Sequence, residues 1–165
     1  MQPEQLRDEV MAELELIRRS VDELSAIASE VGDEQDPGLR INAAAGALLH
    51  SFYNGVESIL KRFAHYHGVP LPKGERYHVD LLDLFRADEH VPPLPPLLHD
   101  GLGDQLDPFR RFRHFFRSTY SFQLDWSKLA TGAASAAGVF GEFERRAQAA
   151  LPPSASSAGR GGGRG

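Results

Sequence analysis

One segment of the sequence, residues 109–120, combines residue types that bind phosphate and transfer protons. It reads FRRFRHFFRSTY and places four arginines, one histidine and one tyrosine among four phenylalanines, although the formal net charge of the chain is −5. Arginine stays charged at physiological pH and offers paired N–H donors to phosphate oxygens. Histidine exchanges a proton near neutral pH, as cleavage of RNA by its own 2′-hydroxyl requires. The segment therefore indicates a phosphate-binding site.

A helical projection separates this segment into two faces, because residues three and four apart share a side of a helix. The phenylalanines gather on the side that we expect to face the core. The other side carries the candidate site residues, which are Arg110, Arg113, His114, Arg117 and Tyr120. A tyrosine at such an edge can donate a hydrogen bond, stack on a base or carry a modification. The alternative is a solvated basic face that balances the acidic N-terminal region, since most charge runs on helices are simply surface.

Two long helices are predicted in the first half of the chain. Apolar or small residues recur in steps of three and four from Val10 to Val31, and again from Ile41 to Phe63. The polar segment GDEQDPG separates the two runs, so we expect an antiparallel helical hairpin. YHVDLLDLFRAD predicts a short helix of two or three turns. The following HVPPLPPLL is expected to be extended, because successive prolines remove amide donors and fix φ.

Two further helices are predicted in the second half. Asp107 and Pro108 are typical of an N-cap and a first helical residue, so a third principal helix is expected from there to about Phe122. Asp125 can cap a fourth, whose inner positions are Trp126, Leu129, Ala133, Ala137, Phe140, Phe143 and Ala147. No segment shows sustained alternation with β-branched residues, so no sheet is expected. The predicted fold class is all-α, a bundle of four principal helices plus one short helix.

Length and composition favour a single domain over residues 1–151, followed by a Gly/Ser/Arg tail, residues 152–165, that we expect to be disordered. No 18-residue apolar run or secretory signal pattern occurs, so we expect a cytoplasmic protein with no membrane association. The absence of cysteine excludes thiolate metal sites and cysteine nucleophiles. His65 and His67 lack any recognised metal-binding spacing, so neither a metal nor another cofactor is predicted.

The segment around Arg113 resembles the HepT-like branch of the HEPN superfamily. The motif of that family is an arginine followed, after four to six residues, by His-x-Tyr, often with a polar residue directly after the arginine. Arg113 matches the arginine, His114 the polar position and Tyr120 the tyrosine, whereas Ser118 stands where the motif histidine is expected. The variant therefore reads R-H-x-x-R-x-x-Y. The segments SFYNGVESILKRFA, YHVDLLDLF and LDW also fit, so the resemblance covers roughly residues 40–130.

The resemblance implies a HEPN-like up-and-down helical bundle and a toxin that works as a metal-independent endoribonuclease in a groove between two subunits. It implies RNA, a second copy of the chain and a nucleotidyltransferase-type antitoxin as partners. Arg113 and Arg117 would hold the scissile phosphate with help from Arg110, and His114 would perform the acid/base chemistry of the missing histidine. Tyr120 would be adenylylated by the antitoxin, which adds bulk and negative charge to an anion-binding groove.

Two residues of the second helix are candidates for a supporting role. Asn54 and Glu57 lie three apart, and Glu57 can orient Arg113 or Arg117 through a bidentate carboxylate–guanidinium contact. The alternative is a surface pair between Glu57 and Lys61 at i,i+4 spacing. Two other functions stay open at this point. One is a catalytically silent helical module that partners a nucleotidyltransferase, as the loss of the motif histidine suggests, and the other is a scaffold with no role in nucleic-acid chemistry.

Overall fold

The computed structural model describes residues 1–90 and 92–153, so the predicted tail from residue 154 onward lies outside the described residues. The described chain is helical, and no strand occurs within it. The elements are α1 (Pro3–Val31), α2 (Leu39–Tyr66), α3 (Tyr77–Arg86), α4 (Leu102–Arg117), the short 3₁₀ helix η1 (Ser121–Gln123) and α5 (Trp126–Ala149). The prediction of an all-α bundle with four principal helices and one short helix is confirmed.

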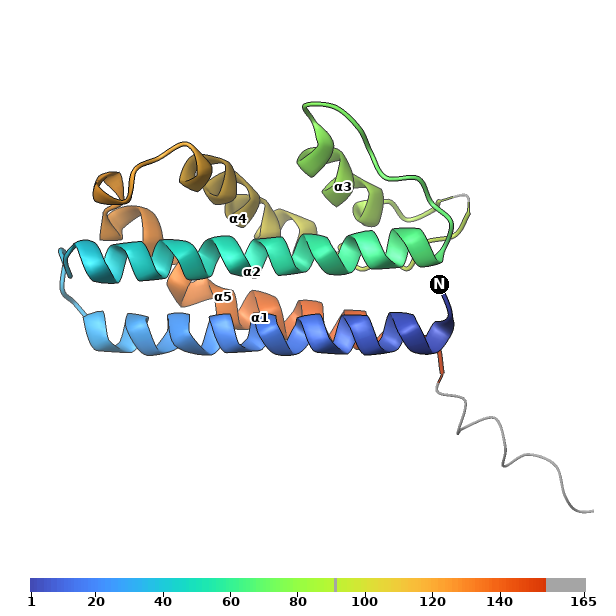
Figure 1. Ribbon diagram of the computed structural model, residues 1–165, viewed down its shortest axis with the longest axis horizontal. Coiled ribbons are helices and arrows are strands. Elements are labelled where there is room, and N and C mark those ends of the chain that lie inside the picture. Colours follow the sequence, from blue (N-terminus) through green and yellow to red (C-terminus); the bar gives the residue numbers. More distant parts are fainter. Residues whose placement is uncertain (91, 154–165) are drawn as a thin grey trace, which may run out of the picture.

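Helix α2 is the central element of the bundle. It runs antiparallel to α1, and α5 packs against both of them, while α4 and α3 lie on the side of α2 that faces away from α1 (Figure 1). The predicted helical hairpin is therefore present. Gly32 ends α1 with a positive φ of 54°, a conformation that glycine adopts without a steric penalty.

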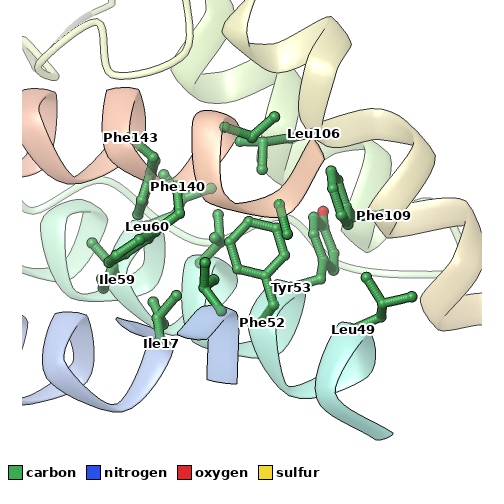
Figure 2. Close-up of a cluster of buried hydrophobic side chains, with 14 of the residues drawn as sticks. Ile17, Leu49, Phe52, Tyr53, Ile59, Leu60, Leu106, Phe109, Phe140 and Phe143 are labelled. Carbon is green, nitrogen blue, oxygen red and sulfur yellow. The ribbon is translucent and has the colours of Figure 1, made fainter. Parts of the chain in front are cut away.

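The core forms where the apolar stripes of α1, α2 and α5 meet the first turns of α4. Figure 2 shows Phe52 and Tyr53 of α2 beside Phe109 of α4, and the Phe52 and Phe109 rings meet edge to face at 4.8 Å. One predicted inner position of α5 is wrong. Ala137 is exposed, because the buried stripe runs through Ala136 and Val139.

Helix α4 begins at Leu102, six residues before Pro108, the predicted first helical residue. Its N-cap is Gly101, in the left-handed region at φ 83°, and Pro108 lies inside the helix. The prediction that Asp107 caps this helix is wrong, because the buried residues Leu102, Leu106 and Phe109 form an apolar stripe that begins earlier. Burial of this stripe outweighs the single backbone hydrogen bond that proline removes. Asp107 instead binds arginine side chains.

The end of α4 also differs from the prediction. The helix stops at Arg117. Tyr120 lies just before η1 and Phe122 lies within it, and their exposed fractions are 70% and 73%. The chain turns back because Leu124 is buried against α2, where the Asn42 side-chain amide lies 3.4 Å from its carbonyl oxygen. Tyr120 therefore does not continue the helical row of Arg113 and Arg117, and the expectation that it shares their side of the same helix is wrong.

Within the described ranges, none of the helices combines the length and apolar character that a membrane span needs.

Candidate functional site

The guanidinium of Arg113 is held by side chains from two other helices. Its Nε–H donates to Oδ1 of Asn54 at 2.6 Å, and its Nη1 lies 3.1 Å from Nε2 of His78 on α3. Nε is also 3.8 Å from Oε1 of Glu57, and only 15% of the arginine side chain is exposed. The solvated basic face considered from the sequence therefore does not describe Arg113, because this side chain points into the interface of α4 with α2 and α3.

Glu57 and His78 form the second layer of this cluster. Glu57 is 2% exposed, and Nδ1 of His78 lies 2.8 and 3.0 Å from its two carboxylate oxygens. Because arginine can only donate, Nε2 of His78 accepts the hydrogen bond from Arg113. The proton of the neutral ring then resides on Nδ1, which donates to Glu57. A continuous chain of hydrogen bonds therefore runs from Arg113 through His78 to a buried carboxylate.

The same geometry decides between the two interpretations of Glu57. A surface pair with Lys61 is wrong, because Glu57 is buried and the Lys61 ammonium lies over the ring of Tyr77 at 5.4 Å. The carboxylate contacts Arg113 through one oxygen at 3.8 Å, so the contact is an ion pair and not the bidentate arrangement considered from the sequence. Asn54 makes the short contact to Nε instead.

The Asn54 and His78 contacts leave Nη2 of Arg113 available. Among the described residues no hydrogen-bond acceptor contacts that nitrogen, which carries two N–H donors. A guanidinium whose orientation is fixed on one side and whose remaining donors are free can bind an anion with little loss of side-chain entropy. The cluster thus presents a positioned cation at the α2–α4 interface.

Arg110 and Arg111 are paired with Asp107. The Nε atoms of the two arginines lie 2.7 and 3.3 Å from the oxygens of that carboxylate. Burial by itself raises the pKa of Asp107, but the hydrogen bond from Arg110 and the charges of Arg110, Arg111 and Arg86 outweigh it and lower the pKa. Much of the charge of Arg110 is therefore compensated within α4. Arg111 is largely exposed and fits the description of a solvated charge.

The exposed members of the site lie at the end of α4. His114 and Arg117 are exposed, and so is Ser118, the C-cap residue. The Ser118 hydroxyl donates to the carbonyl oxygens of Phe115 at 3.1 Å and His114 at 3.4 Å. The residue at the position of the motif histidine thus contacts the end of its own helix. Just beyond it the rings of Tyr120 and Phe122 stack in parallel at 5.4 Å.

Two histidines of this region were missed by sequence reasoning. His78 precedes Leu81, Leu82 and Phe85 at helical spacing, so its place on the inner face of α3 could have been read from the pattern. His50 is one turn before Asn54 on α2, and its ring centroid lies 4.9 Å from that of Phe116. No group of three His, Asp or Glu side chains that could hold a metal ion occurs in the described part of the chain.

A comparison with protein families places this site in context. The family model described as HepT-like protein matches residues 44–151, which is more than half of the chain. The chain belongs to the HepT-like family. The matched region of this HepT-like protein includes Asn54, Glu57, His78 and Arg113, whereas α1 lies outside it. No curated protein and no solved structure matches the sequence.

Proposed function

We propose that this HepT-like protein is the toxin of a toxin–antitoxin pair and acts as a metal-independent endoribonuclease. The observation that carries the proposal is the fixation of Arg113 by Asn54 and His78, next to the exposed Arg117 and His114 at the end of the same helix. A solvated basic surface needs no such fixation. A phosphate site benefits from it, since positioned donors stabilise developing negative charge without reorganisation.

The proposed reaction uses the RNA 2′-hydroxyl as the nucleophile. Its oxygen attacks the adjacent phosphorus, the bond from phosphorus to the 5′-oxygen breaks, and a 2′,3′-cyclic phosphate and a 5′-hydroxyl result. Arg113 and Arg117 stabilise the charge on the phosphate oxygens. Arg110, whose charge Asp107 partly compensates, adds only weakly to the positive field. His114 donates a proton to the departing 5′-oxygen, as a general acid does.

Regulation is proposed to act at Tyr120. This tyrosine is 70% exposed and lies three residues after Arg117, so a partner enzyme can reach its hydroxyl. A nucleotidyltransferase antitoxin transfers the adenylyl group of ATP to the Tyr120 oxygen and releases pyrophosphate. The transfer adds a phosphodiester anion and a bulky base beside the arginines. RNA is then excluded by charge and by volume. A homodimer that pairs the α4 ends of two subunits completes the RNA groove in this proposal.

The catalytic claim is tested by RNA cleavage in excess EDTA. We expect the wild-type protein to cleave, and Arg113→Ala and His114→Ala to lose about 100-fold or more in rate, the typical contribution of acid/base or charge-stabilising groups. Arg111→Ala is the matched control, because it removes an exposed arginine from the same helix, and it should retain activity. Equal cleavage by all four proteins would indicate a contaminating nuclease and remove the claim.

The regulatory claim is tested by co-expression with a small nucleotidyltransferase of the antitoxin type, followed by intact-mass measurement. One adenylyl group per chain is expected, with Tyr120→Phe unmodified. Tyr66→Phe, which removes a tyrosine remote from α4, is the control, and this variant should still carry the adenylyl group on Tyr120. A second modified residue, or modification that persists in Tyr120→Phe, contradicts the assignment.

The capping role of Ser118 favours a second candidate, a catalytically silent module that binds the nucleotidyltransferase. In that case the serine marks the loss of the motif histidine, and its hydroxyl only caps α4. The silent module predicts a stable complex with the nucleotidyltransferase but no Arg113-dependent cleavage of RNA. The EDTA assay and the co-expression experiment together separate the two candidates.

A further inference from the structure

Cleavage of RNA by its own 2′-hydroxyl needs two proton transfers, one from the attacking oxygen and one to the departing oxygen. His114 supplies one of them in the proposed function. The position of the motif histidine holds Ser118, whose hydroxyl contacts the carbonyl oxygens of its own helix. A second proton-transfer group is therefore needed, and an element that faces the end of α4 can supply it.

His50 on α2 has the required position. It lies one turn before Asn54, whose side chain binds Arg113 at 2.6 Å. The His50 ring packs against Phe116, with centroids 4.9 Å apart and planes inclined by 32°. Phe116 directly precedes Arg117 in the sequence. His50 therefore lies where α2 faces the last turn of α4, close enough to Arg113 and Arg117 for their charges to act on its ring.

The surroundings of His50 favour the neutral form of its ring. Its Nδ1 is buried without a hydrogen-bond partner among the described residues, which leaves Nε2 as the nitrogen that can reach a ligand. Burial lowers the pKa of His50 below 6.5, the charges of Arg113 and Arg117 on α4 lower it further, and Glu57 on α2 acts in the opposite direction. A neutral imidazole beside two guanidinium groups can accept a proton at neutral pH.

The two histidines lie on different sides of the arginines. His114 and Phe116 are two residues apart on α4, and such residues point in nearly opposite directions around a helix. Since His50 packs on Phe116, it approaches from the side away from His114. A displacement at phosphorus requires the attacking and departing oxygens to be in line on opposite sides. A base and an acid that flank the bound phosphate match this requirement.

We infer that His50 is the general base of the proposed ribonuclease reaction, an assignment that rests on the proposed function. Nε2 of His50 takes the proton of the 2′-hydroxyl as that oxygen bonds to phosphorus. The bond from phosphorus to the 5′-oxygen breaks, and the 5′-oxygen takes its proton from His114. Each turnover leaves His50 protonated and His114 neutral, and exchange with water restores both.

The first test measures the rate and pH profile of cleavage for His50→Gln and His50→Asn, which remove the proton-accepting ring and keep a polar group. We expect losses of about 100-fold or more in kcat/KM, the range of general-base contributions, and loss of the acid limb of the profile. His65→Gln, an exposed histidine on the same helix, is the matched control and should behave as wild type. Thermal unfolding of each variant establishes that the fold is retained.

A second test separates a base from an acid. An oligonucleotide with sulfur in place of the 5′-oxygen at the mapped cleavage site has a leaving group that departs without a proton. We expect it to restore cleavage by His114→Ala and to leave His50→Gln impaired. Restoration of both variants would show that His50 is not the base.

The outcomes for His50 and for the proposed function differ. Cleavage that requires Arg113 and Arg117 but proceeds at the wild-type rate and pH profile in both folded His50 variants would overturn the role of His50 and leave the proposed function intact. Absence of Arg113-dependent cleavage by the wild-type protein would overturn the proposed function and the role of His50 together.

Discussion

Helix α2 contacts α1 and α4 through interfaces of different chemistry. Toward α1 the interface is apolar and close-packed. A Cβ atom on Gly55 would lie 2.4 Å from Cγ1 of Ile17, so only glycine permits this approach of the two helices. The charged residues stay at the rim, where Arg62 pairs with Glu9 and Glu13.

Toward α4 the same helix presents a mixed surface. Phe52 packs on Phe109, but the neighbouring positions of α2 are polar. His50 packs on Phe116, and Asn54 accepts a hydrogen bond from Arg113. Glu57 binds His78 of α3. Burying such groups costs free energy unless they are hydrogen-bonded or paired, whereas burying aliphatic side chains is favourable in itself. The α1 side thus stabilises the bundle, whereas holding polar groups in position on the α4 side lowers the stability that the bundle would otherwise have.

The largest effect is expected on the apolar interface. Ile17→Ala should lower the free energy of unfolding by about 2–5 kcal/mol, because it leaves a cavity among buried side chains. Urea denaturation measures the loss, and Leu16→Ala, an exposed neighbour on the same helix, should stay within about 0.5 kcal/mol. Cleavage per folded molecule should be unchanged in Ile17→Ala. A loss of cleavage in that variant would contradict the claim that the α1 interface provides stability alone and the α4 interface positions the site.

The polar interface should show coupling between its members. A double-mutant cycle with Glu57→Gln and His78→Phe should give a coupling energy of about 0.5–3 kcal/mol, as expected for groups of one buried network. The exposed i,i+4 pair of Arg76 and Asp80 is the control and should give about 0.3–0.5 kcal/mol. Additive effects of Glu57 and His78 would mean that their contact does not form in solution.

The pH dependence of stability should separate the two interfaces further. The folded-state pKa of His50 lies below its ordinary value of 6.5, mainly because of burial. Between those two values the unfolded chain binds more protons, so stability is complete above pH 6.5 and falls as pH drops through the folded pKa. His50→Gln should flatten this decline, measured as denaturation midpoints from pH 8 to 5, whereas Leu16→Ala, which removes no titratable group, should not. His67, whose pKa burial also lowers, adds to the decline in both variants.

The smallest effect is expected for Arg111. Its side chain is exposed and pairs with Asp107 on the same helix. Arg111→Ala should change the free energy of unfolding by less than about 0.5 kcal/mol, measured in urea. A loss of cleavage as large as that of Arg113→Ala would show that cleavage depends on the total charge of α4 and not on one positioned arginine.

The long helices could be predicted because their apolar residues repeat over many turns. Errors arose where a single position decides which residue is buried or where a helix begins. Ala137 and Ala136 are equally apolar, so the pattern does not show which of them faces the core. The start of α4 was misplaced because Asp107-Pro108 is a strong local signal, whereas burial of Leu102 and Leu106 depends on neighbours that the local sequence does not contain.

The candidate site was predicted only in part, because local spacing points to some of its residues and tertiary contacts position the others. The spacing on α2 drew attention to Asn54 and Glu57, and the basic segment to Arg113. His78 and His50 were missed because each acts through a contact with another helix. Tyr120 was placed on α4 because a helical projection assumes that the helix continues, but the burial of Leu124 ends it.

The sequence by itself determined the helical bundle and the concentration of arginine, histidine and tyrosine in one segment. Both follow from local properties, which are the periodicity of apolar side chains and the chemistry of neighbouring residues. The tertiary structure decided which of four arginines is held against a buried carboxylate and which remain in solvent. It also placed His50 of α2 against Phe116, on the helix that carries these arginines. Burial and hydrogen-bond partners depend on which helices meet, and only the packed bundle defines those neighbours.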